Sequence, residues 1–514
     1  MPSPPMLEFS PARREVFLQA AVRVPSDVVV LGGGLGGAAV ARDAALRGLR
    51  VTLLERGDLA SGASGCPLTR FQAGLGGAGG PAAWLATLRE RALWTELAPQ
   101  RVRVLPLLVP RGRTAPGPDA ADLEGADGSS EAVAETPWLT LDMLRGAAAA
   151  GAAVLPHAEA LEVRRLRPGT WAVSFRDART GREETLEAAA VVNATGDGAL
   201  RARVAPARSG PGWASLRQVH LALPRSLFPA PHGLLLETLR PGGGLAILPW
   251  RDVALVQGPE HPGGPGPVTA AEARSLLEEL QALLPGLDLP VDPGAGAWTR
   301  SRMAGGPSEG FLEGPEGFWT LTGGNRVDVR RVAREVLNRV VPSLGPRAGV
   351  GKPGACSTAL VPLQDGPELG APGPETALHA RAAGLEPEAV RALRARQPGD
   401  WAPLLELMAG EPALARPLPP LEGPGSGHLQ GEVVHAVRHQ MTMTLADLVC
   451  RRLALSLRAP GRAGETLAAA GGLMARELGW DEGERSRQED LARAELARNE
   501  AWRAGPGEAS RPGR

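Results

Sequence analysis

The sequence has no tyrosine and a single lysine, Lys352, so arginine carries nearly all of its positive charge. Glycine and proline are abundant, with 67 and 49 residues, and alanine is also in excess. We attribute this bias first to the composition of the genome and only second to thermal adaptation.

Cysteine is scarce as well. Cys66, Cys356 and Cys450 lie far apart, with no CxxC pair and no histidine nearby at metal-ligand spacing. Neither a disulfide framework nor a zinc site is therefore indicated, and we expect no metal centre.

Long apolar runs are missing. No uninterrupted apolar stretch is long enough to span a bilayer, and the charged residues Glu8, Arg13, Arg14 and Glu15 precede any apolar run that a signal peptide would need. We therefore expect a cytoplasmic protein, with attachment to a membrane surface left open.

An excess of charge of either sign is also absent. Lys+Arg and Asp+Glu both number 56, which gives a formal net charge of +0 and no long-range attraction for a polyanion. Nucleic acid is thus not an expected partner. With 514 residues, 43% hydrophobic and 22% charged, the chain predicts a folded protein of about two to four domains.

A β-α-β unit is predicted near the N-terminus. The apolar run Val28–Leu31 is typical of a strand buried on both faces, and it ends in three glycines. A helix is predicted over 36–47, closed by Gly48, and a second parallel strand over Val51–Leu54. Glu55 follows that strand directly.

The glycines have the spacing of a nucleotide-binding turn. Gly32, Gly34 and Gly37 form G-x-G-x-x-G, with Gly33 between them, immediately after a strand and at the start of a helix. Such glycines allow a tight turn, close approach to a pyrophosphate and close helix packing, and the helix amino end favours the anion. Glu55 is positioned to accept hydrogen bonds from an adenosine ribose. FAD and NAD both remain open on this evidence.

Two later segments favour FAD. A predicted strand runs through Val191–Asn193 into Thr195 and Gly196, which resembles the second nucleotide contact of flavoproteins with two dinucleotide folds. Another runs through 318–322 into Gly323 and Gly324, which resembles the late glycine pair beside the isoalloxazine end of FAD.

The remaining patterns divide the chain. We expect a leader over 1–25, an FAD-dependent oxidoreductase region over 26–343, a Gly/Pro-rich linker over 344–374, a helical domain over 375–502 and a frayed tail over 503–514. Within the second region, residues from about 201 to 300 are expected to bind substrate. We also expect a surface excursion between Pro110 and Pro137, and a hairpin of 170–175 with 184–186, followed by the strand that runs into the turn at Thr195 and Gly196.

Beyond these patterns, the chain resembles one known family. The segment Asp27–Ala63, DVVVLGGGLGGAAVARDAALRGLRVTLLERGDLASGA, closely resembles the opening of the FAD-dependent glycerol-3-phosphate dehydrogenases. Further matches follow in the family's order at 88–110, 219–225, 248–250, 322–330 and 432–452, the last ending in TLADLVCRR. The resemblance covers nearly the whole chain.

The resemblance implies a fold, a cofactor and a reaction. The fold is α/β, a Rossmann-type, D-amino-acid-oxidase-like FAD-binding domain with an interleaved β-rich substrate domain and a C-terminal helical domain. Arg56, Ser61 and Ser64 would join the glycines in binding FAD. The reaction is oxidation of sn-glycerol 3-phosphate at C2 to dihydroxyacetone phosphate, with hydride passing to flavin N5 and electrons to a membrane quinone. Peripheral attachment to the inner face of the cell membrane and homodimer formation stay open.

The same resemblance indicates two substrate-site residues. His220, on the VHLALPR segment, is the candidate for the base or for a group that orients the substrate. Arg302, after Trp298, falls near the family's substrate-binding arginine, although Arg300 is an alternative.

Several positions depart from the family. The H-G-G-L-R-Y motif is replaced by a stretch that contains Gln72, Gly76 and Gly77, and the lysine of G-G-K-x-T-T-Y-R becomes Asn325. The threonine pair becomes Val327 and Asp328, and an acid there would repel a phosphate. The arginines available to compensate are Arg326, Arg330 and Arg70.

These departures keep two alternatives open. One is a flavoprotein that oxidises another small hydroxy or amino compound, because this fold hosts many substrates. The other is a paralogue that keeps the scaffold without turnover and serves as a binding or regulatory protein.

Overall fold

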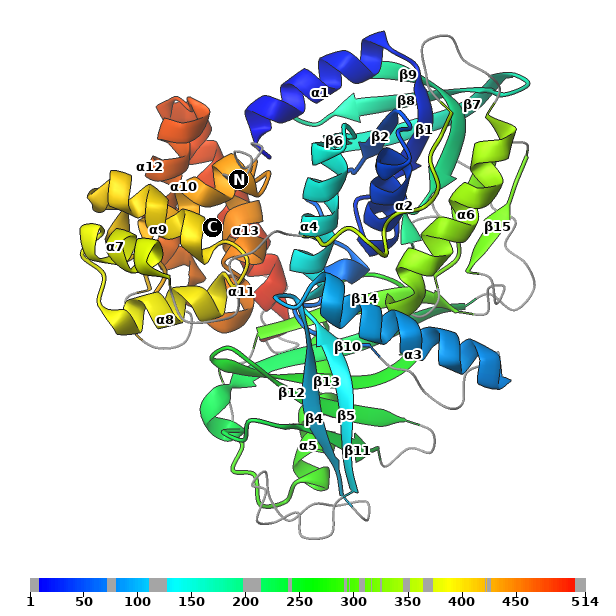
Figure 1. The fold of residues 1–514 in the computed structure, drawn as a ribbon. Helices are drawn as coiled ribbons and strands as arrows, with labels where there is room; N and C mark the ends of the chain where they lie inside the picture. Colours follow the sequence, from blue (N-terminus) through cyan, green and yellow to red (C-terminus); the bar gives the residue numbers. More distant parts are fainter. Residues whose placement is uncertain are drawn as a thin grey trace, which may run out of the picture.

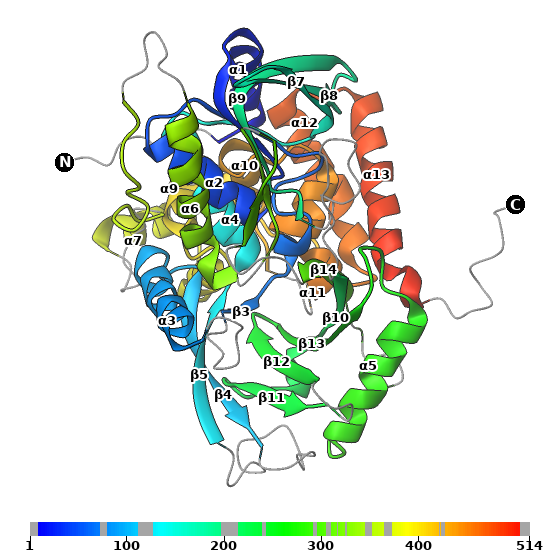
Figure 2. The ribbon, with the colours of Figure 1, turned by 90° about the vertical axis from the view of Figure 1, so that its right-hand side faces the viewer.

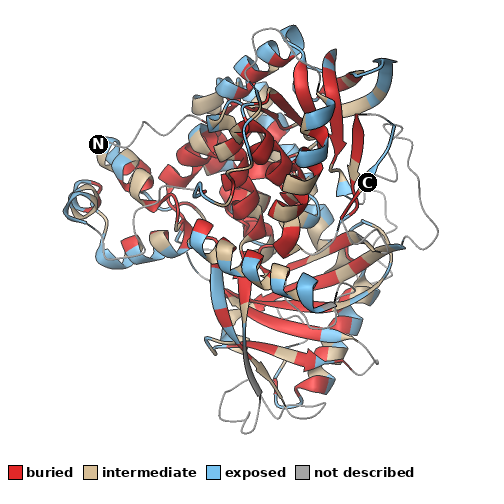
Figure 3. Cartoon of the chain, turned by 45° about the vertical axis from the view of Figure 1, so that its right-hand side comes forward, coloured by how far each residue is buried: buried red, intermediate tan, exposed pale blue. Residues whose placement is uncertain are grey.

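The computed structural model describes residues 9–71, 80–110, 127–196, 214–238, 243–290, 294, 296–304, 310–315, 317–323, 326–344, 352–363, 373–420, 422 and 427–503. These residues form two eight-stranded sheets, one above the other in Figure 1, and a helical C-terminal part beside them. Buried side chains gather on the central strands and on the helices packed against them (Figure 3).

The first sheet contains the predicted β-α-β unit. Its order is β15-β16-β9-β1-β2-β6, and β1 pairs in parallel with both β2 and β9, as β16 does with β9. The strands are β1 (Ser26–Leu31), β2 (Val51–Leu54), β6 (Ala153–Leu155), β9 (Glu183–Asn193), β15 (Phe311–Glu313) and β16 (Phe318–Leu321), with β7 (Ala158–Arg167) and β8 (Thr170–Asp177) joined through β9.

Helices cover both faces of this sheet. Helices α2 (Leu35–Leu46), α4 (Thr136–Ala149) and α6 (Val329–Ser343) share one large apolar core with β1 and β2. On the other face lies α1 (Pro11–Arg23), whose Phe17 and Ala21 pack with Val29 and Leu31. The predicted leader is thus helical from Pro11 and contributes to the core.

One local prediction was wrong and another was confirmed. The segment expected as a surface excursion contains strand β5 (Asp127–Ala134), which pairs along its whole length with β4 (Val102–Val109); residues 111–126 lie outside the described residues. The predicted hairpin of 170–175 with 184–186 is confirmed as the pairing of β8 with the first half of β9. The second half of β9 pairs with β1 and runs into the small-residue turn.

The second sheet lies below the first and has the order β14-β10-β13-β12-β11-β4-β5-β3. Its other strands are β3 (Thr69–Phe71), β10 (Ala214–Pro224), β11 (Gly233–Glu237), β12 (Gly244–Trp250), β13 (Val253–Pro262) and β14 (Gly296–Ala304). Helix α5 (Ala270–Leu283) begins with a Thr269–Glu272 capping box and buries Leu276, Leu280 and Leu283 against the sheet. Helix α3 (Gly80–Leu97) contacts β4 of this sheet and the short helix η5 (Arg326–Asp328), and Figure 2 shows it at one side of the molecule.

The helical part has its own core, in which Trp401, Leu404, Val433 and Leu448 are buried. Its helices are α7 (Pro374–Ala382), α8 (Pro387–Arg396), α9 (Trp401–Gly410), α10 (Gln430–His439), the π-helix η7 (Asp447–Arg452), α11 (Leu455–Arg458), α12 (Leu467–Leu478) and α13 (Glu482–Glu500). Across the part of the chain that the structure describes, none of the helices is both long and apolar enough to cross a membrane.

The described part of the predicted linker, residues 352–363, packs on the first sheet's helices. Arg42 of α2 donates to the carbonyl oxygens of Val361 at 2.6 Å and Pro362 at 3.2 Å. Leu363 is buried in the core of the first sheet. This segment therefore runs in contact with α2 on its way to the helical part.

Candidate active site

Two glycines bring α2 directly against the end of β1. Gly32 has a φ of +104°, and a Cβ there would lie 2.6 Å from the carbonyl oxygen of Ala194. A Cβ at Gly37 would lie 1.9 Å from the carbonyl oxygen of Gly32. Neither position has room for a side chain. The amino end of α2 therefore lies over the strand end, where its backbone N–H groups favour an anion.

Glu55, at the end of β2, hydrogen-bonds this glycine turn. Its carboxylate accepts from the backbone N–H of Gly33 at 2.7 Å and from that of Gly57 at 2.9 Å. The side chain is half-buried. The acid thus lies beside the glycine turn, and its role toward a ribose stays a prediction.

The loop after Glu55 returns to the same helix end. The Ser64 hydroxyl accepts a hydrogen bond from the backbone N–H of Leu35 at 2.9 Å, and its oxygen lies 3.1 Å from the Cβ position of Gly34. Arg56 and Ser61 are exposed on this loop. Ser64 therefore belongs to the glycine turn, whereas Arg56 and Ser61 lie at its rim.

The turn after β9 meets the glycine turn. The backbone N–H of Ala194 donates to the carbonyl oxygen of Leu31 at 2.8 Å. Asn193 Oδ1 accepts from the backbone N–H of Thr195 at 3.2 Å and from its hydroxyl at 2.8 Å. Gly196 follows with a φ of +63°. The predicted pair Thr195 and Gly196 is thus brought to the end of β1.

The turn after β16 lies on the other side of α2. Gly323 is exposed and has a φ of +89°, and Leu321 Cδ1 lies 3.0 Å from the Cβ position of Gly36. Three turns therefore meet at the carboxyl edge of one parallel sheet, the place where open α/β sheets bind ligands. The predicted residues Gly324, Asn325, Gln72, Gly76 and Gly77 lie outside the described residues.

His220 lies on β10 of the second sheet and is fully buried. Its ring stacks on Trp298, with centroids 4.9 Å apart and an angle of 13° between the planes. Neither ring nitrogen has a hydrogen-bond partner among the described residues. Burial, and then the charges of Arg300 and Arg326, hold the pKa of His220 well below its usual range. His220 is therefore a neutral imidazole with two nitrogens available.

Two arginines on β14 share one glutamate next to His220. Arg300 and Arg302 stand two positions apart, so they lie on the same side of the strand. Glu260 of β13 accepts from Arg300 at 2.9 Å and from Arg302 at 2.8 and 2.6 Å. Burial raises the pKa of Glu260, but Arg302 and Arg300 outweigh that effect, so the pKa is lowered and the group is a carboxylate.

Arg326 begins the short helix η5 (Arg326–Asp328) after the Gly323 turn. Burial, followed by the charge of Arg300, lowers the pKa of Arg326 to about 9. The guanidinium stays charged at neutral pH. Among the three candidates for compensation, Arg326 is the one whose charge acts on Arg300 and Arg302.

The other two candidates for compensation have different roles. Arg330 is buried in an ion pair with Glu90 of α3 and donates to the Thr358 hydroxyl at 3.2 Å. Arg70 forms a bidentate pair with Glu131, at 2.6 and 3.0 Å. Both arginines therefore bind neighbouring elements.

The expected repulsion by Asp328 is not supported by its contacts. Its two carboxylate oxygens each accept from the Thr87 hydroxyl on α3 at 3.2 Å, and Arg331 lies 3.5 Å away. The carboxylate is turned toward α3, because α3 packs across η5. The Asp328 carboxylate thus joins η5 to α3 through Thr87 and pairs with Arg331.

Glu260 has no local signal in the sequence and was not among the predicted site residues. Glu260 lies 42 positions before Arg302, and the two meet only because β10 lies between β13 and β14. The one signal available was the spacing of Arg300 and Arg302, which predicts two cations on one face of a strand and hence a nearby acid.

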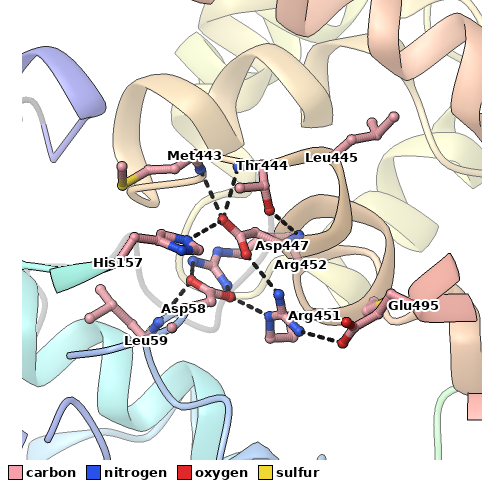
Figure 4. Close-up of polar contacts among 12 residues, drawn as sticks. Asp58, Leu59, His157, Met443, Thr444, Leu445, Asp447, Arg451, Arg452 and Glu495 are labelled. Atoms are coloured by element: carbon pink, nitrogen blue, oxygen red, sulfur yellow. Dashed lines mark hydrogen bonds and ion pairs between the residues drawn. The ribbon is translucent and has the colours of Figure 1, made fainter. Parts of the chain in front are cut away.

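The loop that carries Ser64 is also joined to the helical part by a buried polar cluster (Figure 4). Arg452 donates to both oxygens of Asp58 at 2.8 Å, and Arg451 donates to Asp58 at 2.6 Å and to Asp447 at 2.7 Å. His157 Nε2 lies 2.9 Å from Asp447. The ligand atoms of the two acids and the histidine lie within 4.8 Å of one another, but both carboxylates already accept from guanidinium groups.

Comparison with known proteins agrees with this arrangement. Residues 27–107 and 108–329 match the family of FAD dependent oxidoreductases, and residues 356–485 match the C-terminal domain of alpha-glycerophosphate oxidase. Glycerol-3-phosphate dehydrogenase 2 of Mycobacterium bovis is 26% identical over 93% of this chain and 89% of its own length. The glycerol-3-phosphate dehydrogenase of Mycobacterium leprae is 26% identical over 88% of this chain and 85% of its own length.

A solved structure shares the fold. The structure of the glycerol-3-phosphate dehydrogenase from Bacillus halodurans, complexed with FAD, has a TM-score of 0.77 at 23% identity and covers 95% of this chain and 98% of that one. The predicted fold class, an α/β FAD-binding fold with a helical C-terminal domain, is confirmed.

The residues present fit the cofactor of this family. Gly32 and Gly37 let the amino end of α2 approach the end of β1 closely, and His220 keeps two buried nitrogens without partners among the described residues. The chain belongs to the family of FAD-dependent oxidoreductases, with FAD as its cofactor, and is similar over most of its length to glycerol-3-phosphate dehydrogenases.

Proposed function

We propose that this FAD-dependent oxidoreductase oxidises sn-glycerol 3-phosphate at C2 to dihydroxyacetone phosphate and passes the electrons to a quinone. The names of its relatives support the substrate, and the match to an α-glycerophosphate oxidase domain supports the same substrate class.

The observation that carries the proposal is a neutral, buried His220 beside a positive cluster. Arg300 and Arg302 share Glu260, and the charges of Arg300 and Arg302 also act on Arg326, so arginines outnumber acids among these four residues. A phosphate monoester is a dianion at neutral pH, and excess positive charge favours its binding.

FAD would be held by the turns at the edge of the first sheet, and when bound it supplies the hydride acceptor. Gly32, Gly33, Gly34 and Gly37 would approach its diphosphate, with Ser64 beside them and Arg56 and Ser61 at the rim. Glu55 would bind the ribose, and Thr195, Gly196, Gly323 and Gly324 would line the remaining length of the cofactor.

His220 would act on the substrate hydroxyl. A neutral imidazole can accept the hydroxyl proton at one nitrogen, and stacking on Trp298 holds its ring in one orientation. Arg300 and Arg326 lower the pKa of His220 in the unliganded site, and a bound dianion offsets those two charges. Substrate binding would therefore make His220 a stronger base.

An anaerobic titration tests the reaction. The purified yellow protein is titrated with glycerol 3-phosphate. We expect the absorbance of the oxidised flavin, at about 450 nm, to bleach. Glycerol, which lacks the phosphate, is the control and should leave the absorbance unchanged. Colour without bleaching would contradict the proposal. Reoxidation of the bleached protein by a soluble quinone analogue then tests the acceptor.

A second candidate is oxidation of a small hydroxy or amino acid. The lysine of the family's G-G-K-x-T-T-Y-R segment is Asn325 in this chain, so one cation for a phosphate is missing, and this fold hosts many substrates. Bleaching by a hydroxy or amino acid, with none by glycerol 3-phosphate, would favour this candidate.

A further inference from the structure

Gln257 of β13 lies directly opposite His220 of β10 in the second sheet. The two are Cα partners in the antiparallel register, and Trp298 of β14 is the partner of His220 on its other side. Residues directly opposite one another on paired strands project from the same face of a sheet, with Cβ atoms roughly 5 Å apart. Gln257, His220 and Trp298 therefore form one row of side chains on one face of the second sheet.

The amide of Gln257 reaches from this row to a different part of the chain. Its Nε2 donates to the carbonyl oxygen of Leu68 at 2.8 Å, and both residues are buried. The Cys66 thiol donates to the same oxygen at 3.2 Å, but a thiol is a weak donor. A buried carbonyl that loses its partner keeps the cost of desolvation. Gln257 therefore supplies the stronger of the two bonds that fix the backbone at Leu68.

Leu68 is the end of the loop that borders the cofactor site. We define the cofactor loop as residues 56–68, the last of which precedes β3. Within it, the Ser64 hydroxyl accepts from the backbone N–H of Leu35 at the amino end of α2. Leu68 is fully buried and shares a core cluster with apolar side chains of β12 and β13. The cofactor loop is thus joined to α2 at Ser64 and to the second sheet at Leu68.

The hydrogen bond from Gln257 to Leu68 therefore connects the two halves of the site. The glycine turn that would hold the diphosphate of FAD belongs to the first sheet, and His220 belongs to the second. Transfer of a hydride and a proton requires reacting atoms about 3–3.5 Å apart, and a displacement of about 1 Å can lower the rate about 100-fold. A contact that fixes the cofactor loop relative to His220 thus acts on the rate.

We propose that Gln257 is a positioning residue. Its amide holds the cofactor loop against the face of the second sheet that carries His220, and this sets the separation between the flavin and the base. The role given to His220 rests on the proposed function, whereas the hold of Gln257 on the loop does not depend on any reaction. Gln257 acts through the loop and not on the substrate.

Two variants remove the contact in different ways. Gln257→Met keeps nearly the same volume but has no N–H donor, and Gln257→Asn keeps an amide on a side chain that is one methylene too short to reach Leu68. The matched control is Gln281→Met on α5. Gln281 Nε2 also donates to a backbone carbonyl, that of Leu287 at 2.9 Å, but α5 packs on the opposite face of the second sheet, with residues that alternate with His220 and Gln257.

Two measurements are made on each FAD-loaded protein. Anaerobic stopped-flow absorbance gives the limiting rate of flavin reduction by glycerol 3-phosphate and the half-saturating substrate concentration. Labelling with iodoacetamide, followed by mass spectrometry, gives separate rates for Cys66 in the cofactor loop and for Cys450 in the helical part, both of which are buried.

We expect Gln257→Met to lower the limiting rate about 10- to 100-fold with the half-saturating concentration unchanged, because the contact acts on the reacting geometry and not on substrate binding. Cys66 should react about tenfold faster, because the loop opens more readily, while the rate at Cys450 stays the same. Gln257→Asn should show the same two changes, and Gln281→Met should show neither.

The proposal is overturned if Gln257→Met matches Gln281→Met in the limiting rate or in the labelling of Cys66. It is also overturned if Cys450 reacts faster by the same factor as Cys66, because Gln257 would then stabilise the fold in general. Should Gln257→Met fail to fold or to retain FAD, the same measurements on Gln257→Asn decide. If glycerol 3-phosphate leaves the unmodified protein unbleached, the proposed substrate fails, and the labelling rates alone decide whether Gln257 holds the loop.

Discussion

Asp58 and Arg452 lie 394 positions apart and form a bidentate ion pair with both hydrogen bonds at 2.8 Å (Figure 4). Asp58 belongs to the loop that supplies Ser64 to the glycine turn, and Arg452 ends the π-helix η7 of the helical part. The side chain of Asp58 is fully buried, and Arg451 also donates to it. The helical part thus holds the loop that borders the cofactor site.

Replacing Asp58 with Asn should therefore reduce both stability and FAD retention. The change leaves the buried Arg452 guanidinium without a carboxylate and takes one of its carboxylate partners from Arg451, which keeps Asp447; the expected cost is about 3–5 kcal/mol. Urea denaturation measures the loss of stability, and FAD fluorescence after dilution measures release. Arg493→Gln, which breaks an exposed pair with Asp490, is the control and should change stability by about 0–1 kcal/mol. Equal effects of the two variants would show that the buried pair has no special role.

Replacing Gly37 with Ala tests the contact between α2 and β1. The new Cβ would overlap the carbonyl oxygen of Gly32 at 1.9 Å, which is backbone and cannot rotate away, so we expect a loss of about 3 kcal/mol or more and of FAD binding. Gly472→Ala in α12 is the matched control, because a Cβ there meets nothing within 4 Å and should stabilise the helix by about 1 kcal/mol. Thermal unfolding without added FAD measures stability, and the shift in melting temperature on adding FAD measures cofactor binding. A Gly37→Ala protein with the same melting temperature as the unmodified protein would contradict the close contact between α2 and β1.

Replacing His220 with Asn tests its role in the proposed reaction. Removal of a proton acceptor should lower kcat about 100-fold or more while FAD content stays unchanged. Burial, Arg300 and Arg326 hold the pKa of His220 below its usual range. The pH profile of kcat/KM for the unmodified protein should therefore show no titration at about pH 6.5, the ordinary pKa of histidine. An unchanged kcat in the variant would remove His220 from the mechanism.

The β-α-β unit could be predicted because its signals are local. The apolar run of β1, the glycines that follow it and Glu55 after β2 all lie within about thirty residues, and each has a direct physical meaning. Strand β5 could not be predicted in the same way. Its sequence, DGSSEAVA, lacks a long apolar run, and it forms because β4 and β3 pair on its two sides.

The cofactor side of the site followed from the sequence better than the substrate side did. Glycine positions, strand ends and the acid have a fixed order along the chain, whereas the pairing of Glu260 with Arg302 depends on how β13, β10 and β14 are ordered. The pairing of Asp58 with Arg452 joins two parts of the fold and has no local signal. Charged pairs of this kind need the tertiary structure.

His428 gives a last prediction, on the pH dependence of stability. Its Nε2 accepts from Arg458 at 2.7 Å and its Nδ1 faces Glu432 at 2.9 Å. Because a guanidinium can only donate, Nε2 must be unprotonated, and His428 is neutral with its proton on Nδ1. Burial, opposed by Glu432, lowers the pKa of His428 to about 4.

The unfolded chain binds a proton at this histidine below about pH 6.5, whereas the folded protein resists it down to about pH 4. The contribution of His428 to the free energy of unfolding should therefore be fully present above about pH 6.5. It should fall by about 3 kcal/mol as the pH drops from about 6.5 to about 4. His428→Gln can keep both hydrogen bonds without titrating. When urea denaturation is measured between pH 7 and pH 5, the free energy of unfolding should therefore fall less steeply with decreasing pH in His428→Gln than in the control His379→Gln on α7. Equal slopes for the two variants would mean that His428 is not the group whose protonation destabilises the protein. Burial raises the pKa of Glu432, but Arg396 and His428 hold it well below its usual range, so a further loss of stability below about pH 4.5 would be due to Glu432.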